Sequence, residues 1–391
     1  MKKTLLIALL TGVFSATANA QTSVTLYGLI DTGLTYVSNQ KVSGAPAGTG
    51  HSNFLMTNGS VVPDRFGLRG SEDLGGGLKA IFTLENGFTL TNGAFGQHGA
   101  LFGRQAFVGL SSDQYGTLTL GRQYDSMVDY LAPLSGAGGN NGGVFFAHPY
   151  DNDNLQNTMR INNAVKYASL NYSGWQFGSL YGFSNAAGGF SNNRAYSFGT
   201  SYHNGPVRFA ASYLQINNGG SLSNLAGATD SLATGGSDST FSAGQQRTFG
   251  AGLNYTFGPA TVGFVFTETK LENATEINNT NSASIGLGDA SLRLDNYEIN
   301  ARYSLTPAFT LIGSYTYTDG SYSLAGGSRP KWNQANLMLS YALSQRTNLY
   351  VEGQYQQVSG GGNQFTADIN GLAPSATNKQ VAATVGLLTR F

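Results

Sequence analysis

The sequence predicts an all-β fold, a 16-stranded antiparallel transmembrane β-barrel with short periplasmic turns and long extracellular loops. Three observations support this prediction. Polar and apolar residues alternate along nearly the whole chain, and the connections between the alternating segments are short and long in turn. The composition also fits, because the 391 residues include 54 glycines while only 11% of them are charged. Soluble domains carry roughly 25% charged residues and about half as much glycine.

Composition also excludes several classes of protein. The 21 basic residues are balanced by 21 acidic residues, so the basic excess of a nucleic-acid binder is missing and we expect no nucleic-acid partner. The chain has no cysteine, which excludes a disulfide, a cysteine-ligated zinc site and a thiol nucleophile. Intrinsic disorder is disfavoured, since 40% of the residues are apolar and 12% are aromatic.

The first twenty residues have the pattern of a secretory signal peptide. Lys2 and Lys3 precede a short apolar run, and Ala18 and Ala20 form a small-x-small cleavage site. The run is too short to be a membrane-spanning helix, which needs about 18–20 apolar residues. We therefore expect residues 1–20 to be removed and residues 21–391 to form one barrel domain.

Residues 24–37 set the pattern of the strands. Val24, Leu26, Ile30 and Leu34 lie at even positions, with mostly polar or small residues between them. A period of two places successive side chains on opposite faces of a strand. Sixteen such segments are expected, at residues 24–37, 64–73, 77–87, 102–111, 115–123, 161–172, 174–184, 194–203, 206–216, 246–257, 260–271, 292–305, 307–318, 332–343, 346–358 and 379–391.

The connections indicate which kind of barrel this is. The long ones are rich in Gly, Asn, Ser and Asp, and they are residues 38–63, 88–101, 124–160, 185–193, 217–245, 272–291, 319–331 and 359–378. Outer-membrane barrels have short turns at one end and long loops at the other. Such a sheet must close on itself, because backbone polar groups cannot stay unpaired in lipid. Aromatic residues near strand ends, among them Tyr27, Tyr255, Trp332 and Tyr341, are expected to form girdles at the membrane surfaces.

Several longer strings resemble one family across the whole chain. They are Val24–Asp31, Arg65–Gly75, Leu78–Glu85, Leu118–Arg122, Leu343–Tyr350 and Val385–Phe391. As a set, they resemble the general diffusion porins of Gram-negative outer membranes, in the beta-proteobacterial branch found in Neisseria, Bordetella and Burkholderia. The resemblance implies passive, non-specific transport of ions and small hydrophilic solutes through a water-filled pore, without a cofactor.

The resemblance also implies partners. It predicts a homotrimer in contact with outer-membrane lipid and lipopolysaccharide. It further predicts that the barrel-assembly machinery reads a C-terminal signal ending in Phe391, which follows apolar residues at every second position.

A charged constriction is the site that the resemblance implies. The third long loop, residues 124–160, is expected to fold into the barrel and narrow the pore. By motif position, Arg65, Arg122 and Arg160 match the arginine ladder of the family, and Arg69 and Arg104 are further candidates for the same wall. The loop lacks the Pro-Glu-Phe-Gly-Gly string of enterobacterial porins, and its candidate acids are Asp125, Asp129 and Asp151. Arginines facing carboxylates would create a transverse field that selects between ions.

The sequence disfavours catalysis and metal binding. The chain has no Gly-x-Ser-x-Gly nucleophile motif, and Asp151-Asn-Asp-Asn154 begins like a calcium loop but lacks its glycine. We therefore expect neither catalysis nor a metal site. A substrate-specific channel for a sugar or an anion is the alternative function. Composition alone leaves the preference between anions and cations open.

Overall fold

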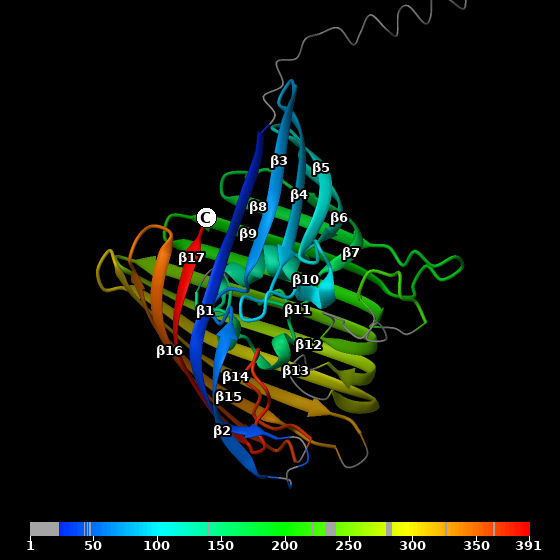
Figure 1. Cartoon of the computed structure of the whole chain (residues 1–391). Helices are drawn as coiled ribbons and strands as arrows, with labels where there is room; N and C mark the ends of the chain where they lie inside the picture. The colour runs from blue at the N-terminus through cyan, green and yellow to red at the C-terminus, as the bar shows by residue number, and fades with distance from the viewer. Residues whose placement is uncertain are drawn as a thin grey trace, which may run out of the picture.

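The computed structural model describes residues 23–391, apart from positions 43, 45, 47, 139, 140, 221, 222, 231–239, 279–283, 325, 326 and 363. The expected signal peptide, with Ala18 and Ala20, lies outside the described residues. The described chain forms a ring of antiparallel strands around an interior segment (Figure 1). No helix in this part of the chain is long and apolar enough to cross a membrane.

Strands make up the wall. They are β1 (Ser23–Lys41), β2 (Gly50–Asn58), β3 (Arg65–Gly75), β4 (Leu78–Gly87), β5 (Gln105–Ser112), β6 (Gly116–Gln123), β7 (Ile161–Ala168), β8 (Trp175–Gly182), β9 (Arg194–Asn204), β10 (Val207–Gly219), β11 (Phe241–Phe257), β12 (Ala260–Ile277), β13 (Ile285–Ser304), β14 (Phe309–Tyr322), β15 (Lys331–Ala342), β16 (Thr347–Ser359) and β17 (Lys379–Arg390). Each strand from β3 to β17 pairs with the next, all antiparallel.

The first strand closes the ring. β1 pairs with β17 over Leu29–Val37, and Figure 1 shows the two lying side by side. On its other side, β1 pairs with β3 over Ser23–Leu29 and with β2 over Thr32–Lys41. β2 and β3 therefore occupy successive stretches of one position in the wall, and the seventeen strands make a closed barrel of sixteen positions. This confirms the predicted fold class.

One predicted connection was wrong. Residues 38–63 were expected to be an open loop, but Gly50–Asn58 forms β2. This segment is stabilised by its ladder with β1 and by the Phe54 ring, which lies 5.1 Å from that of Tyr36. All sixteen predicted strands are present. The largest differences in their bounds are extensions, since β12 continues to Ile277 and β13 begins at Ile285.

Alternation separates an apolar outer face from a polar lumen. In β15 and β16, Leu337, Leu339 and Val351 are exposed on the outside, while the alternating Gln334 and Gln354 are buried on the inside. A soluble protein would show the reverse arrangement. This polarity is the one that a barrel surrounded by lipid requires.

Aromatic residues follow the expected girdles in part. Aromatic pairs occur near strand ends. Phe309 and Tyr341 are both exposed, and their ring centroids are 4.4 Å apart; exposed Trp175 lies 4.6 Å from the partly buried Tyr202. The expectation for Trp332 was wrong. Its side chain is only 1% exposed, because it occupies a lumen-facing position of β15 and packs edge-on against Tyr150.

The long segment between β6 and β7, described at residues 124–138 and 141–160, lies inside the ring. It contacts Ser197 of β9, Thr267 of β12 and Gln334 of β15, which stand at separate positions around the wall. A segment that reaches all three must cross the interior, as Figure 1 shows. Its helical turns are η2 (Met127–Leu131), η3 (Ala132–Leu134), η4 (Val144–Phe146) and η5 (Pro149–Asp151). We call this segment the inner loop.

Candidate functional site

The inner loop is fixed to the barrel wall by a buried histidine between two carboxylates. His148 Nδ1 lies 2.6 Å from Asp153 Oδ2, and Nε2 lies 3.2 Å from Glu298 Oε2 on β13. Burial alone would lower the pKa of His148, but Asp153 and Glu298 raise it to about 10. The imidazole is therefore charged at neutral pH, and both nitrogens donate to carboxylate oxygens.

Further hydrogen bonds reinforce this attachment. Asp153 Oδ2 also accepts from the Thr267 hydroxyl at 2.6 Å, and Glu298 Oε1 accepts from the backbone N–H of Gly136 at 2.8 Å. On the other side of the loop, the Gln334 amide donates to the Phe145 carbonyl at 2.9 Å. The inner loop is thus held to β12, β13 and β15 by polar contacts.

Three arginines gather where β3, β4 and the inner loop meet. Arg104 Nε donates to Glu85 Oε1 at 2.8 Å, and Arg65 Nη1 lies 3.9 Å from the same oxygen. Arg104 Nη2 donates to the Tyr124 hydroxyl at 2.7 Å, and the Arg160 guanidinium lies 5.7 Å from the centre of the Tyr124 ring. We call Arg65, Arg104 and Arg160 the arginine cluster.

The arginine cluster concentrates three positively charged side chains beside the inner loop. Glu85 lies beside two of the guanidinium groups, those of Arg65 and Arg104, and all three arginines stay ionised at any physiological pH. Asn157 joins two of them, because its Oδ1 accepts from both Arg104 and Arg160 at 3.2 Å. Arg65 is the most accessible of the three, with 17% of its side chain exposed.

The other two candidate arginines lie apart from the cluster. Arg122 donates to the Gly103 carbonyl at 2.7 Å and forms an ion pair of 3.2 Å with Asp230, in the connection between β10 and β11. Arg69 shares the lumen face of β3 with Arg65, and its guanidinium lies over the Tyr27 ring, 5.4 Å from its centre. Arg69 therefore lies four residues further along β3, toward the periplasmic end of the pore.

The three candidate acids of the inner loop are held by groups other than the arginine cluster. Asp125 is fully buried and accepts from the Met127 N–H at 2.7 Å. Asp129 forms an ion pair with Lys166 of β7. Asp151 accepts from two backbone N–H groups, of Gln156 at 2.9 Å and Thr158 at 3.0 Å, and its burial raises its pKa to about 7.

Sequence reasoning missed several residues that shape the site. Glu85 of β4 could have been found, because it pairs with Gly67 of β3. Gly67 and Arg65 lie on the same face of β3, so Glu85 shares that face with Arg65. Tyr124 and Asn157 belong to the inner loop, but nothing in the sequence marks them as arginine partners. His148 and Glu298 are 150 positions apart, so only the fold brings them together.

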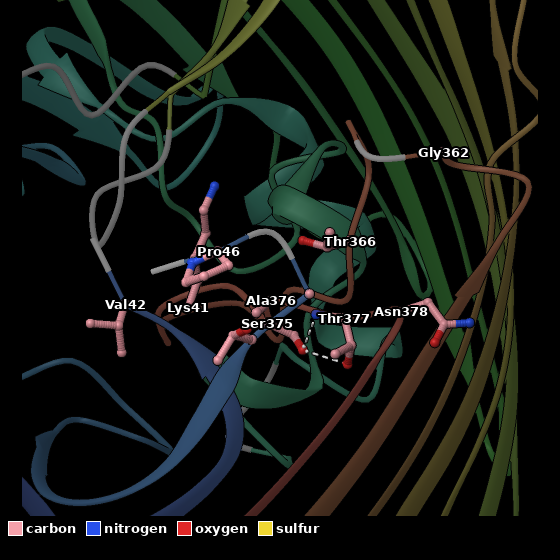
Figure 2. A pocket seen from close by; sticks show the side chains of 11 residues that line it. Lys41, Val42, Pro46, Gly362, Thr366, Ser375, Ala376, Thr377 and Asn378 are labelled. Atoms are coloured by element: carbon pink, nitrogen blue, oxygen red, sulfur yellow. Dashed lines mark hydrogen bonds between the residues drawn. The ribbon is translucent and has the colours of Figure 1, made fainter. Parts of the chain in front are cut away.

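Two cavities lie near the inner loop and the extracellular mouth. One, of about 240 Å³, is lined by Arg104, Arg160, His98 and Asn157 and adjoins the arginine cluster. The other, of about 410 Å³, lies between the end of β1 and the connection before β17. Figure 2 shows the hydroxyl groups of Ser375 and Thr377 hydrogen-bonded to each other within it.

This fold and site define a class of protein. A closed barrel with an apolar exterior, a polar lumen and a charged loop inside is an outer-membrane channel. The chain belongs to the Gram-negative porin family, whose sequence profile matches residues 5–361. It is a transport protein of the Gram-negative outer membrane.

Individual relatives agree with this family. An outer membrane porin protein of Bordetella pertussis is 36% identical over 376 residues, covering 91% of this chain and 94% of the relative. Outer membrane porin protein 32 of Delftia acidovorans is 36% identical over 188 residues, or 47% of this chain and 50% of the relative. The major outer membrane protein P.IB of Neisseria gonorrhoeae is 29% identical over 214 residues, covering 52% of this chain and 54% of the relative. These relatives confirm the beta-proteobacterial branch.

Solved structures share the fold. The anion-selective porin from Comamonas acidovorans superposes with a TM-score of 0.70 at 24% identity, covering 95% of this chain and all of that one. The trimer form of OmpT from Vibrio cholerae superposes with a TM-score of 0.64 at 14% identity, covering 95% of this chain and 99% of that one. These similarities support the barrel architecture.

Proposed function

We propose that the protein is a general diffusion porin that lets ions and small hydrophilic solutes cross the outer membrane passively, with a preference for anions. The arginine cluster carries this proposal. Arg65, Arg104 and Arg160 place three positive charges around Glu85 beside the inner loop. Fixed charges of one sign in a narrow aqueous passage raise the local concentration of the opposite ion.

The inner loop would set the size limit. It crosses the lumen from β9 to β15 and is held by the His148 contacts, so the water-filled passage is narrowed at that level. The lumen wall offers mostly amides and hydroxyls, such as Gln354 and Thr384, and these give no selectivity for one solute. The proposal assigns transport and no catalysis.

An anion-specific channel is the second candidate. The Comamonas acidovorans structure is described as an anion-selective porin, and the cavity beside Arg104 and Arg160 could hold an anion. The two candidates differ in how current depends on concentration. A diffusion pore gives a current that rises in proportion to salt, whereas a specific site saturates.

Conductance in a planar bilayer tests both candidates. The purified protein should give large, ohmic steps that do not saturate with potassium chloride concentration. A salt gradient should give a reversal potential of the sign expected for chloride. A saturating current would favour the specific channel, and the absence of conductance would overturn both.

We also propose a homotrimer, inserted among lipid and lipopolysaccharide. The trimer form of OmpT, which shares this fold, supports the assembly state. Light scattering on the detergent-solubilised protein should give three times the mass of one chain. A monomeric mass in mild detergent, with conductance retained, would contradict the trimer.

The C-terminal residue supports the proposed recognition by the barrel-assembly machinery. Phe391 exchanges two backbone hydrogen bonds of 3.0 Å with Gly28 of β1, and its half-exposed ring lies against that glycine. Deleting Phe391 should reduce the amount of protein in the outer membrane. Refolding of the purified chain in detergent should be much less affected. Equal losses in both assays would indicate a purely structural role.

A further inference from the structure

A third cavity lies inside the barrel on the periplasmic side of the inner loop. Its volume is about 260 Å³, and it is bounded by the lumen faces of β13–β17 together with Val61 and Asn141. Two arginines that line it, Arg302 and Arg390, come from the periplasmic ends of their strands. Arg302 lies two positions before the end of β13, and Arg390 is the last residue of β17. The cavity is therefore next to the short turns, away from the arginine cluster.

Part of the lining of this cavity is apolar. Ile312 and Met338 face each other on β14 and β15, and with Leu388 of β17 they line the cavity. The three residues belong to one buried cluster with Phe146 of the inner loop, and each is only 3–4% exposed. Their remaining surface gives the cavity an apolar side, whereas Gln334, farther along the same lumen face of β15, is polar.

Cationic groups lie on either side of this apolar surface. Arg302 is directly across from Ile312, and Arg390 is two positions from Leu388 on the same strand. Within the described residues, neither guanidinium forms a hydrogen bond or an ion pair with a carboxylate, so both have donors available. Arg302 is exposed to the lumen.

The nearby carboxylates do not occupy these donors. Asp31, which interacts with Arg390 electrostatically, is fully buried, and its oxygens accept from the Tyr350 hydroxyl at 2.7 Å and from the Val61 and Val62 N–H groups at 2.9 and 2.8 Å. Glu352, across from Met338, is buried outside the cavity lining. The cavity therefore offers guanidinium donors beside an apolar surface.

We propose that this cavity binds small organic anions with an apolar body, such as aromatic or short-chain carboxylates. A guanidinium group binds a carboxylate with two parallel hydrogen bonds, and the apolar body would cover Ile312, Met338 and Leu388. The volume is that of about nine water molecules, which limits the ligand to a small one. This site is additional to the proposed diffusion function, and its ligand would enter from the periplasmic side.

Benzoate is a suitable probe, and binding can be measured by calorimetry on the folded, detergent-solubilised protein. Benzoate should bind saturably. Acetate keeps the charge without the apolar body, and benzylammonium keeps the apolar body with the opposite charge. Each should bind at least tenfold more weakly. Equal binding of acetate or benzylammonium would overturn the proposal.

Variants locate the site. The double variant Arg302→Gln with Arg390→Gln should weaken benzoate binding at least tenfold, and Met338→Gln should weaken it in the same direction. Arg346→Gln, in the exposed turn between β15 and β16, and Arg65→Gln, in the arginine cluster, should leave it unchanged. Unchanged binding in the double variant would overturn the proposal, as would its loss in Arg65→Gln.

Bilayer recordings separate this inference from the proposed function. Benzoate added on the side of the short turns should reduce the current of the native pore more than benzoate added on the opposite side. Normal conductance in potassium chloride without this block would count against the binding site alone. A protein that does not conduct would count against the porin function, while calorimetry would still decide the binding site.

Discussion

The Nε atom of Arg104 lies 2.8 Å from Oε1 of Glu85, and both side chains are buried inside the barrel. The same carboxylate lies 3.9 Å from Arg65 Nη1, and its other oxygen accepts from the Tyr27 hydroxyl at 2.9 Å. One acid therefore balances part of the charge of the arginine cluster and orders the groups around it. Under the proposed function, this relationship links the stability of the barrel to the selectivity of the pore.

Replacing this acid should change both properties. In Glu85→Gln the arginine cluster gains net positive charge, so the reversal potential should move further toward that of a pure anion channel. Stability should fall, because removing one partner of a buried ion pair costs roughly 3–5 kcal/mol. Salt-gradient recordings and the unfolding temperature measure the two effects. Glu72→Gln, at an exposed position of β3, is the matched control and should change neither. An unaltered reversal potential in Glu85→Gln would place the cluster outside the ion path.

The candidate arginines can be ranked by charge reversal. Arg65→Glu should shift the reversal potential strongly toward cations, because Arg65 is the most accessible member of the cluster. Arg122→Glu should shift it in the same direction but less, since Asp230 at 3.2 Å already offsets the charge of Arg122. Reversal potentials of both variants in the same salt gradient make the comparison. A shift in Arg122→Glu as large as that in Arg65→Glu would contradict this ranking, and no shift would place Arg122 outside the constriction.

The barrel was predictable because alternation is a local signal repeated along every strand. Leu337, Leu339 and Tyr341 fix the outer face of β15, and the same parity shows why the girdle prediction for Trp332 was wrong. β2 was missed because Gly50–Asn58 lies in a loop-like composition and gains its strand form from pairing with β1. A period of two identifies strands better than it identifies their partners.

The candidate site was less predictable, because its contacts join distant parts of the chain. Motif position predicted Arg65, Arg104 and Arg160 as candidates for the same wall of the pore, and the structure places them together. The same reasoning could not pair Asp129 with Lys166, which requires the path of the inner loop through the lumen. The roles of these residues in ion selection stay predictions until the variants are measured.

Loss of the buried histidine should loosen the inner loop. In His148→Gln the positive charge between Asp153 and Glu298 disappears, and two buried carboxylates lose their shared partner. We expect noisier open-channel current and closure at lower voltage than in the native pore, because the loop is less firmly held to β13.

An exposed histidine provides the control for this effect. His203→Gln, at the end of β9, should behave as the native pore does, since His203 is exposed at the protein surface. Quiet current and an unchanged closing voltage in His148→Gln would show that the contacts of Gly136, Thr267 and Gln334 are sufficient to hold the loop.

The pH dependence of stability should report on Asp151. Burial and the neighbouring Asp153 raise the pKa of Asp151 from 3.8 to about 7. An acid whose pKa is raised by folding favours the folded state fully below its unfolded pKa, and this contribution is lost as the pH rises through the folded pKa. Between pH 4 and pH 8 the native barrel should therefore lose stability on the order of 4 kcal/mol from this group.

Asp151→Asn cannot ionise, so it should lack this loss while keeping an oxygen that accepts from Gln156 or Thr158. His148 stays charged over the same range, because its pKa is about 10. The unfolding temperatures of the native protein and of Asp151→Asn should therefore diverge as the pH rises from 4 to 8. Relative to the native protein, Asp151→Asn should be more stable at pH 8 than at pH 5. Parallel curves would mean that Asp151 is already ionised, or still neutral, throughout the range.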